Sequence, residues 1–142
     1  MYLLDTNVVS ELRKVGAGKA DAAVAAWQKT VPVNQAFLSA MTVFELEVGV
    51  LLLERRDPAQ AIAFRKWLSS LVATVFYGRI LPIDIAVASR AAQLHIPDRR
   101  PDRDTFIAAT ALVHGMTMVT RNVADFAGTG VHVLNPWESS HP

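Results

Sequence analysis

Four acidic side chains occupy positions from which a cluster of carboxylates could form, and Asp5 is the first of them. It ends the short apolar run Tyr2–Leu4 and is followed by two small polar residues, Thr6 and Asn7. A buried run that stops at an acid is typical of a strand that brings the acid to the carboxyl edge of a parallel sheet, where ligands and catalytic groups collect. Alternatively, Asp5 or Asn7 simply caps a helix that begins near Val8.

Glu45 is the second acid, in a helix expected from Met41 to Arg56. Its own face of that helix is apolar and carries Met41, Val48, Gly49 and Leu52. We therefore expect Glu45 to point inward, whereas Glu47 and Glu54 share a more solvent-facing stripe. An unpaired charge on an inward face costs several kcal/mol, so Glu45 needs a cation, a hydrogen-bond network or a raised pKa. The alternative is a salt bridge to an arginine from another segment.

Asp104 and Asp125 lie further along the chain. Asp104 falls in the first turn of a helix for which Asp102 is the expected N-cap. It could therefore serve only the helix dipole, an effect of about 0.3–1 kcal/mol. Asp125 follows the strand expected at Met116–Thr120 by a few residues, so it should arrive at the same carboxyl edge as Asp5.

Acids that converge from separate segments repel one another, by about 1 kcal/mol per close pair in water and several times that in a drier cleft. A hard divalent cation removes this repulsion. The chain has no cysteine, and its histidines show no ligand spacing; they are His95, His114, His132 and His141. A site built from oxygen ligands favours Mg²⁺ or Mn²⁺ over zinc.

The elements that must position these acids alternate along the chain. After Tyr2–Leu4, strands are expected at Ala36–Ser39, Ile80–Ile83, Met116–Thr120 and Val131–Leu134. Helices are expected at Val8–Arg13, Ala20–Trp27, Met41–Arg56, Pro58–Ala73, Ile85–Leu94 and Thr105–His114, with Asp57 and Asp84 as caps and Gly115 as a stop. This alternation predicts a parallel sheet between helical layers.

Composition limits the class of protein. A chain of 142 residues with 51% hydrophobic and 19% charged residues is expected to be a single domain, residues 1–142, with more apolar surface than a monomer needs. The net charge of +1 gives no argument from overall basicity, so a nucleic-acid partner would need a local patch. We expect a cytoplasmic protein, because the apolar run before Asp5 is too short for a signal peptide or a membrane span.

Five motifs keep the order and spacing of a known family. They are Leu3–Val8, Leu38–Leu46, Asp104–Ala111, Val119–Asn122 and Asn135–Trp137. Nearly from end to end, the chain resembles PIN-domain ribonucleases, above all the FitB-like and VapC toxins of bacterial toxin–antitoxin pairs. The resemblance implies a three-layer α/β/α sandwich around a central, mainly parallel sheet of about five strands.

The resemblance also implies an acidic site in which Asp5, Glu45 and Asp104 bind Mg²⁺, with Mn²⁺ as a substitute. Relatives often carry a fourth catalytic acid after the fourth strand; here Asn122 occupies one candidate position and Asp125 another. A metal held there would lower the pKa of a bound water and orient it towards an RNA phosphodiester. The side chains expected to tune the acids are Thr6, Asn7, Thr120 and Asn122. For Thr6 and Asn7 the alternative role is local helix capping.

The expected partners follow from the same resemblance. Arginines placed to hold the RNA backbone are Arg99, Arg100, Arg103 and Arg121, although each could equally be a solvated charge. The resemblance further implies a homodimer and a cognate antitoxin that fills a groove leading to the acids, in a complex that binds promoter DNA through the antitoxin.

Two other classes remain as alternatives. A haloacid-dehalogenase-like phosphatase would use Asp5 as its nucleophile, but it would need an acid where the chain has Asn7 and a later lysine, and the lysines are at 14, 19, 29 and 66. The other alternative is a non-catalytic, partner-binding PIN-like domain, against which the intact Asp5, Glu45 and Asp104 argue.

Overall fold

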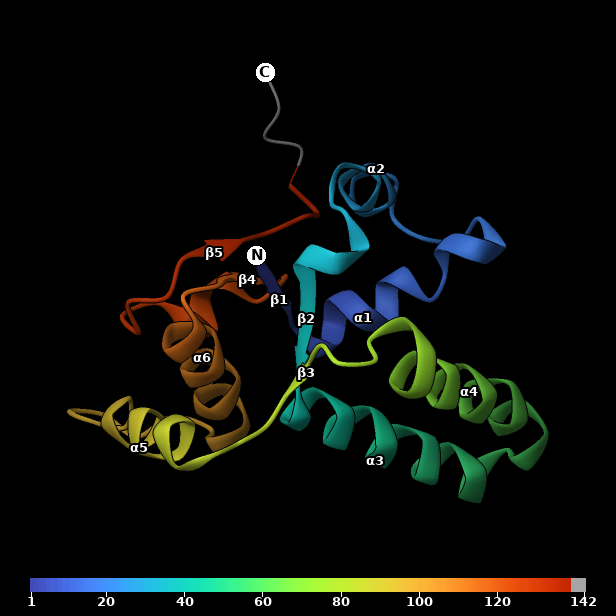
Figure 1. The fold of residues 1–142 in the computed structure, drawn as a ribbon. Helices are drawn as coiled ribbons and strands as arrows, with labels where there is room; N and C mark the ends of the chain where they lie inside the picture. The colour runs from blue at the N-terminus through green and yellow to red at the C-terminus, as the bar shows by residue number, and fades with distance from the viewer. Residues whose placement is uncertain (139–142) are drawn as a thin grey trace.

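Five parallel strands form a sheet in the order β3-β2-β1-β4-β5, so that β1 lies in the centre (Figure 1). The strands are β1 (Tyr2–Leu4), β2 (Ala36–Ser39), β3 (Ile80–Leu81), β4 (Thr117–Val119) and β5 (Val133–Leu134). The computed structural model describes residues 1–138, and His141 lies outside this range. The parallel sheet expected from the sequence is confirmed, with β3, β4 and β5 shorter than expected.

Helices cover both faces of the sheet. They are α1 (Thr6–Leu12), α2 (Ala22–Thr30), α3 (Ala40–Arg56), α4 (Pro58–Ser70), α5 (Ile85–Gln93) and α6 (Asp102–His114). In Figure 1, α5 and α6 lie on one side of the strands and α1 to α4 on the other. Leu3 belongs to the core beneath α5 and α6, and Leu4 to the core beneath the other helices, because successive strand residues face opposite ways. The expected three-layer arrangement is confirmed.

Acidic caps start several of these helices. The Asp57 carboxylate accepts a hydrogen bond from Gln60 N (3.2 Å), and that of Asp84 accepts one from Val87 N (3.0 Å), so both expected caps are confirmed. Asp21, which was not expected as a cap, starts α2 at Ala22. Within residues 1–138, no helix is long and apolar enough to cross a bilayer.

The prediction that Asp102 caps α6 is wrong. The Pro101 carbonyl accepts the first helical hydrogen bond, from Thr105 N at 3.2 Å, so the helix already includes Asp102. A residue with helical backbone angles cannot fold its side chain back as an N-cap. Asp102 and Asp104 therefore share the first turn of α6. At the other end, Gly115 adopts a φ of +65° and stops the helix as expected.

Three other helices differ from their expected bounds by more than one residue. Helix α2 covers Ala22–Thr30 rather than Ala20–Trp27, because Asp21 caps its start. Helix α1 begins at Thr6 rather than near Val8, because Asp5 itself is the cap. Helix α4 ends at Ser70 and continues as one π-helical turn over Leu71–Val75, in which Phe76 N bonds to the Leu71 carbonyl (2.9 Å). A π-helical turn shifts the register of the side chains that follow it.

Candidate active site

Asp5 lies at the carboxyl end of the central strand and is only 7% exposed. Its backbone N–H extends the pairing with β4 by donating to the Val119 carbonyl (2.9 Å). Its Oδ1 accepts from Thr6 N (2.8 Å), which caps α1. Its Oδ2 accepts from Thr120 Oγ1 (2.7 Å) and Asn7 Nδ2 (3.3 Å). The two interpretations of Asp5 are thus compatible, because one carboxylate both caps a helix and stands at the sheet edge.

Burial raises the pKa of Asp5 above its ordinary value, and the negative charge of Asp125 raises it a little further. The hydrogen bonds from Thr120, Thr6 and Asn7 oppose this rise by stabilising the ionised form, but they offset only part of it. Three hydrogen-bond donors therefore hold the Asp5 carboxylate in one orientation, and it is largely buried from solvent.

Thr120 and Asn7 form a bridge between α1 and the end of β4. Thr120 Oγ1 donates to Asp5 and accepts from Asn122 N (3.0 Å) and Asn7 Nδ2 (3.3 Å). Asn7 Oδ1 accepts from Arg121 N (3.2 Å). Thr120 and Asn7 thus both donate to Asp5, while Asn122 enters this bridge through its backbone amide.

Glu45 stands at the side of α3 nearest to Thr6 and is 25% exposed. Its Oε1 accepts from Thr6 Oγ1 (2.9 Å), and its Oε2 lies 3.8 Å from Arg103 Nη1. Both the hydrogen-bond network and the arginine partner considered for this acid are therefore present. Thr6 acts on Glu45 through its side chain and on Asp5 through its backbone N–H.

The expected inward face of α3 is wrong. Leu52, which was assigned to it, is 60% exposed, and Gly49 is exposed as well. The buried side chains of this helix are Thr42, Leu46, Val50 and Leu53. The sheet and α4 cover this second stripe, so Glu45 lies at the border between core and solvent. Glu47 and Glu54 face solvent as expected, and Arg65 pairs with both of them (2.6 and 2.8 Å).

Asp104 lies in the first turn of α6. Its pKa rises to about 6, first because it is partly buried and then because Asp125, Asp5 and Glu45 place negative charge near it. Among the hydrogen bonds of residues 1–138, none ends on its carboxylate. The structure thus brings four acids, from four separate segments, within electrostatic range of one another.

The donor set suits a hard cation, since every acidic ligand atom is a carboxylate oxygen and Asp104 has spare acceptor capacity. In the part of the chain that the structure describes, no three acidic or histidine side chains already converge as ligands of one ion. Glu45 is instead turned towards Thr6 and Arg103. The site therefore suits a divalent cation by the chemistry of its oxygen ligands and by the mutual repulsion of its acids.

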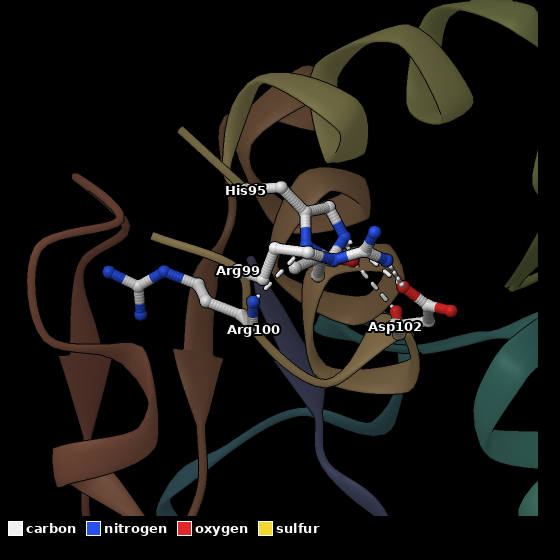
Figure 2. Close-up of polar contacts among 5 residues, drawn as sticks. His95, Arg99, Arg100 and Asp102 are labelled. Atoms are coloured by element: carbon white, nitrogen blue, oxygen red, sulfur yellow. Dashed lines mark hydrogen bonds and ion pairs between the residues drawn. The ribbon is translucent and has the colours of Figure 1, made fainter. Parts of the chain in front are cut away.

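The four arginines differ in availability. Arg100 donates to the carbonyls of Ala127 (2.9 Å) and Asp125 (3.4 Å), so it is occupied in holding the loop that carries Asp125. Arg99 is 83% exposed and lies 3.8 Å from Asp102, and in Figure 2 it extends away from Arg100. Arg103 and Arg121 each stand beside an aromatic ring, and Arg103 also lies 3.8 Å from Glu45.

His95 is a residue whose role the sequence did not reveal. Arg100 N donates to its Nδ1 (3.2 Å), and its Nε2 lies 3.2 Å from Asp102 Oδ1 and 3.3 Å from Thr105 Oγ1 (Figure 2). One imidazole thereby joins the loop before α6 to the first turn that carries Asp104. The histidine has no neighbour at metal-ligand spacing, so its type and position gave no signal of this bracing role.

The fold and the site together define a class of protein. It is an α/β/α sandwich with acidic side chains at the carboxyl ends of its parallel strands. A family model described as PIN domain matches residues 2–129. The chain belongs to the PIN-domain family.

Within that family the chain is similar to toxins. It is 35% identical to VapC ribonuclease Y4jK of Sinorhizobium fredii, across 97% of this chain and 99% of the relative. It is 37% identical to Toxin FitB of Neisseria gonorrhoeae, across 96% and 99%. A solved structure of FitAB bound to an IR36 DNA fragment superposes with a TM-score of 0.86 at 35% identity, covering 99% of each chain. The resemblance stated from the motifs is confirmed.

Proposed function

We propose that this protein is a Mg²⁺-dependent endoribonuclease toxin of a toxin–antitoxin pair, which hydrolyses RNA phosphodiester bonds at the edge formed by Asp5, Glu45, Asp104 and Asp125. The observation that carries the proposal is the convergence of these four acids from separate segments at one edge of the sheet, where burial and then the charges of Asp125, Asp5 and Glu45 raise the pKa of Asp104. Mutual repulsion of this kind is costly for a metal-free protein and is relieved by a divalent cation. The similarity to a protein named as a VapC ribonuclease supports the same activity.

Each residue of the site has a proposed role. Asp5, Glu45 and Asp104 would hold Mg²⁺, with Mn²⁺ as a substitute, and Asp125 would add charge to the site. When bound, the metal lowers the pKa of an attacking water and stabilises charge on the phosphate oxygens. Thr120 and Asn7 fix the orientation of Asp5, and Thr6 fixes that of Glu45. Arg103 and Arg121 supply positive charge for the substrate backbone.

The test is cleavage of a labelled single-stranded RNA by the purified protein. We expect cleavage in Mg²⁺ or Mn²⁺ and none in EDTA, and we expect Asp5→Asn and Asp104→Asn to abolish it while the circular dichroism spectrum stays unchanged. An exposed carboxylate remote from the site, Glu54→Gln, is the matched control. Parent-like cleavage by either aspartate variant would refute the site assignment.

The same assay separates the alternatives. A phosphatase that uses Asp5 as nucleophile is disfavoured because both carboxylate oxygens already accept hydrogen bonds and Asn7 is one of the donors. A partner-binding domain without catalysis would show no metal-dependent cleavage at all.

The proposed antitoxin would use an apolar pocket of about 210 Å³ between α1, α2 and the π-helical turn after α4. Its walls include Leu12, Trp27, Trp67 and Leu71. An apolar antitoxin segment seated there could extend a basic side chain along α1 to Asp5, neutralise the acids and displace the metal. The solved structure of FitAB bound to an IR36 DNA fragment, whose matching chain is 35% identical to this one, supports an antitoxin partner and a complex that binds DNA.

We further propose a cytoplasmic homodimer that uses exposed apolar residues of α3, among them Leu51 and Leu52. Co-expression with the neighbouring antitoxin gene, followed by light scattering and the RNA assay, tests both contacts. A monomer that remains fully active in the presence of that protein would contradict the proposed regulation.

A further inference from the structure

Two arginine–aromatic pairs lie beside the acidic edge. The Arg103 guanidinium carbon stands 5.0 Å from the centre of the Phe44 ring, and that of Arg121 stands 5.1 Å from the centre of the Trp137 ring. Phe44 is 49% exposed although it is a large apolar side chain, and Arg103 is 52% exposed. The role of the acids does not explain why either ring is placed there.

The sheet order puts the two pairs on opposite sides of Asp5. Phe44 and Glu45 belong to α3, which follows β2, and β2 neighbours β1 on one side. Arg121 follows β4 and Trp137 follows β5, and these strands lie on the other side of β1. A strand of nucleic acid that crosses the acids from one side to the other would therefore meet one aromatic ring and one guanidinium before them, and another such pair after them.

We propose that Phe44 and Trp137 are stacking platforms for the bases on either side of the scissile phosphate, with Arg103 and Arg121 holding the adjoining phosphates. The inference rests on the proposed ribonuclease function and adds a specificity determinant to it. Stacking on a ring requires a base that has left its own helical stack, so the platforms select single-stranded or looped RNA over duplex. Since every base has a π face, they confer little sequence preference.

Charge argues for RNA rather than a protein surface as the occupant of Phe44. The exposed stripe of α3 continues at Leu51, about 10 Å further along the helix at 1.5 Å per residue. Leu51 suits a contact with another apolar surface. Phe44 instead carries a cation on its ring and sits next to Glu45, and burying that half-exposed guanidinium against apolar atoms would cost free energy that a phosphate would offset.

The experiment measures fluorescence anisotropy of a labelled single-stranded RNA in EDTA at low salt, where cleavage cannot occur. We expect Phe44→Ala to weaken binding about 5- to 150-fold, which corresponds to the loss of one base stack, and Phe44→Trp to stay close to the parent. Tyr77→Ala is the matched control. Tyr77 is an exposed aromatic residue that precedes β3, so it lies towards the amino-terminal ends of the strands, whereas the acids lie at their carboxyl ends.

An abasic scan identifies the stacked nucleotides. Replacing one nucleotide at a time by an abasic site should produce two positions that weaken binding to the parent protein, one on each side of the cleaved bond. At one of them Phe44→Ala should have no further effect. The scan reports the Trp137 platform without any substitution, which matters because Trp137 also packs against the core and its variants could unfold.

Two results of the binding measurements would overturn the inference. One is equal weakening of all abasic RNAs by Phe44→Ala. The other is a loss of binding by Phe44→Ala and Leu51→Ala alike, accompanied by dissociation of a dimer in light scattering, which would make α3 a protein interface. Cleavage in Mg²⁺ is measured in parallel. Abasic-sensitive binding without cleavage by the parent would refute the ribonuclease proposal alone, and cleavage without abasic sensitivity would refute the platforms alone.

Discussion

Thr120 donates its hydroxyl proton to Asp5 Oδ2 at 2.7 Å, joining the ends of β4 and β1, which are 115 positions apart in the chain. The Thr120 hydroxyl oxygen in turn accepts a hydrogen bond from the Asn122 backbone amide (3.0 Å). A small hydroxyl side chain thus holds the central acid in place while it fixes the turn after β4.

Thr120→Val should both destabilise the protein and alter Asp5. The substitution keeps the shape of the side chain but leaves a buried carboxylate short of one donor and the Asn122 amide without its acceptor, at a cost of about 1–3 kcal/mol. Because the hydrogen bond from Thr120 lowers the pKa of Asp5, its loss should raise that pKa further. Urea unfolding at pH 7 measures the first effect and carboxyl-carbon NMR titration the second. Thr120→Ser, which keeps the hydroxyl, should behave like the parent in both.

The metal-free protein should become less stable as pH rises through about 6. The pKa of Asp104 increases from 3.8 to about 6 on folding, so the folded state binds this proton more tightly than the unfolded chain does. The stabilising contribution of the proton is complete below pH 3.8 and disappears as pH passes the folded value. Melting in EDTA across this window measures the slope, and Asp104→Asn should flatten it. An unchanged slope in that variant would assign the titration to another group.

Added Mg²⁺ or Mn²⁺ should raise the melting temperature at pH 7.5, because a ligand that binds only the native state stabilises it by mass action. Glu45→Gln should reduce this shift. The substitution should also stabilise the metal-free protein slightly, because it removes one of the charges that repel one another. It also removes the ion pair with Arg103, but that arginine is half exposed, and an ion pair there contributes little to stability. Differential scanning fluorimetry over a metal titration decides the matter. A melt that ignores metal, with Glu45→Gln destabilising, would indicate a purely structural salt bridge.

Asp125 and Asn122 can be distinguished as the fourth position of the site. Asp125 is the largest charged contributor to the raised pKa of Asp104, whereas Asn122 joins the network through its backbone. Asp125→Asn should therefore lower the pKa of Asp104 and weaken Mg²⁺ binding, while Asn122→Ala should change neither. NMR titration and isothermal calorimetry provide the readouts. The opposite pattern would assign the position to Asn122.

Local signals in the sequence were sufficient to predict much of this arrangement. The run Tyr2–Leu4 stops at an acid because a buried strand ends there, and the alternation of strands and helices requires a parallel sheet. The caps Asp57 and Asp84 were equally predictable, since their hydrogen bonds reach only three residues ahead.

Features that depend on how elements pack were not predictable. Apolar residues do recur at helical spacing from Met41 to Leu52. Periodicity alone, however, does not reveal which side of a helix is covered by neighbouring elements. In the structure, the sheet and α4 cover the side of α3 that carries Leu46. The predicted start of α6 was wrong for a related reason. Asp102 is a residue type suited to capping, but the carbonyl of the preceding Pro101 accepts the first helical hydrogen bond. The contacts of His95 and Arg100 join segments whose proximity exists only in the folded chain.

The double use of Asp5, as a helix cap and as the central acid, should be visible in a genetic selection. If expression of the free protein is harmful, survivors carrying substitutions at Asp104 or Glu45 should accumulate full-length protein at normal abundance. Survivors with most substitutions at Asp5 should contain less protein, because removing the cap costs about 0.5–2 kcal/mol in addition to the activity. Asn and Ser at this position, which can still cap α1, should be the inactive exceptions that persist at parental levels.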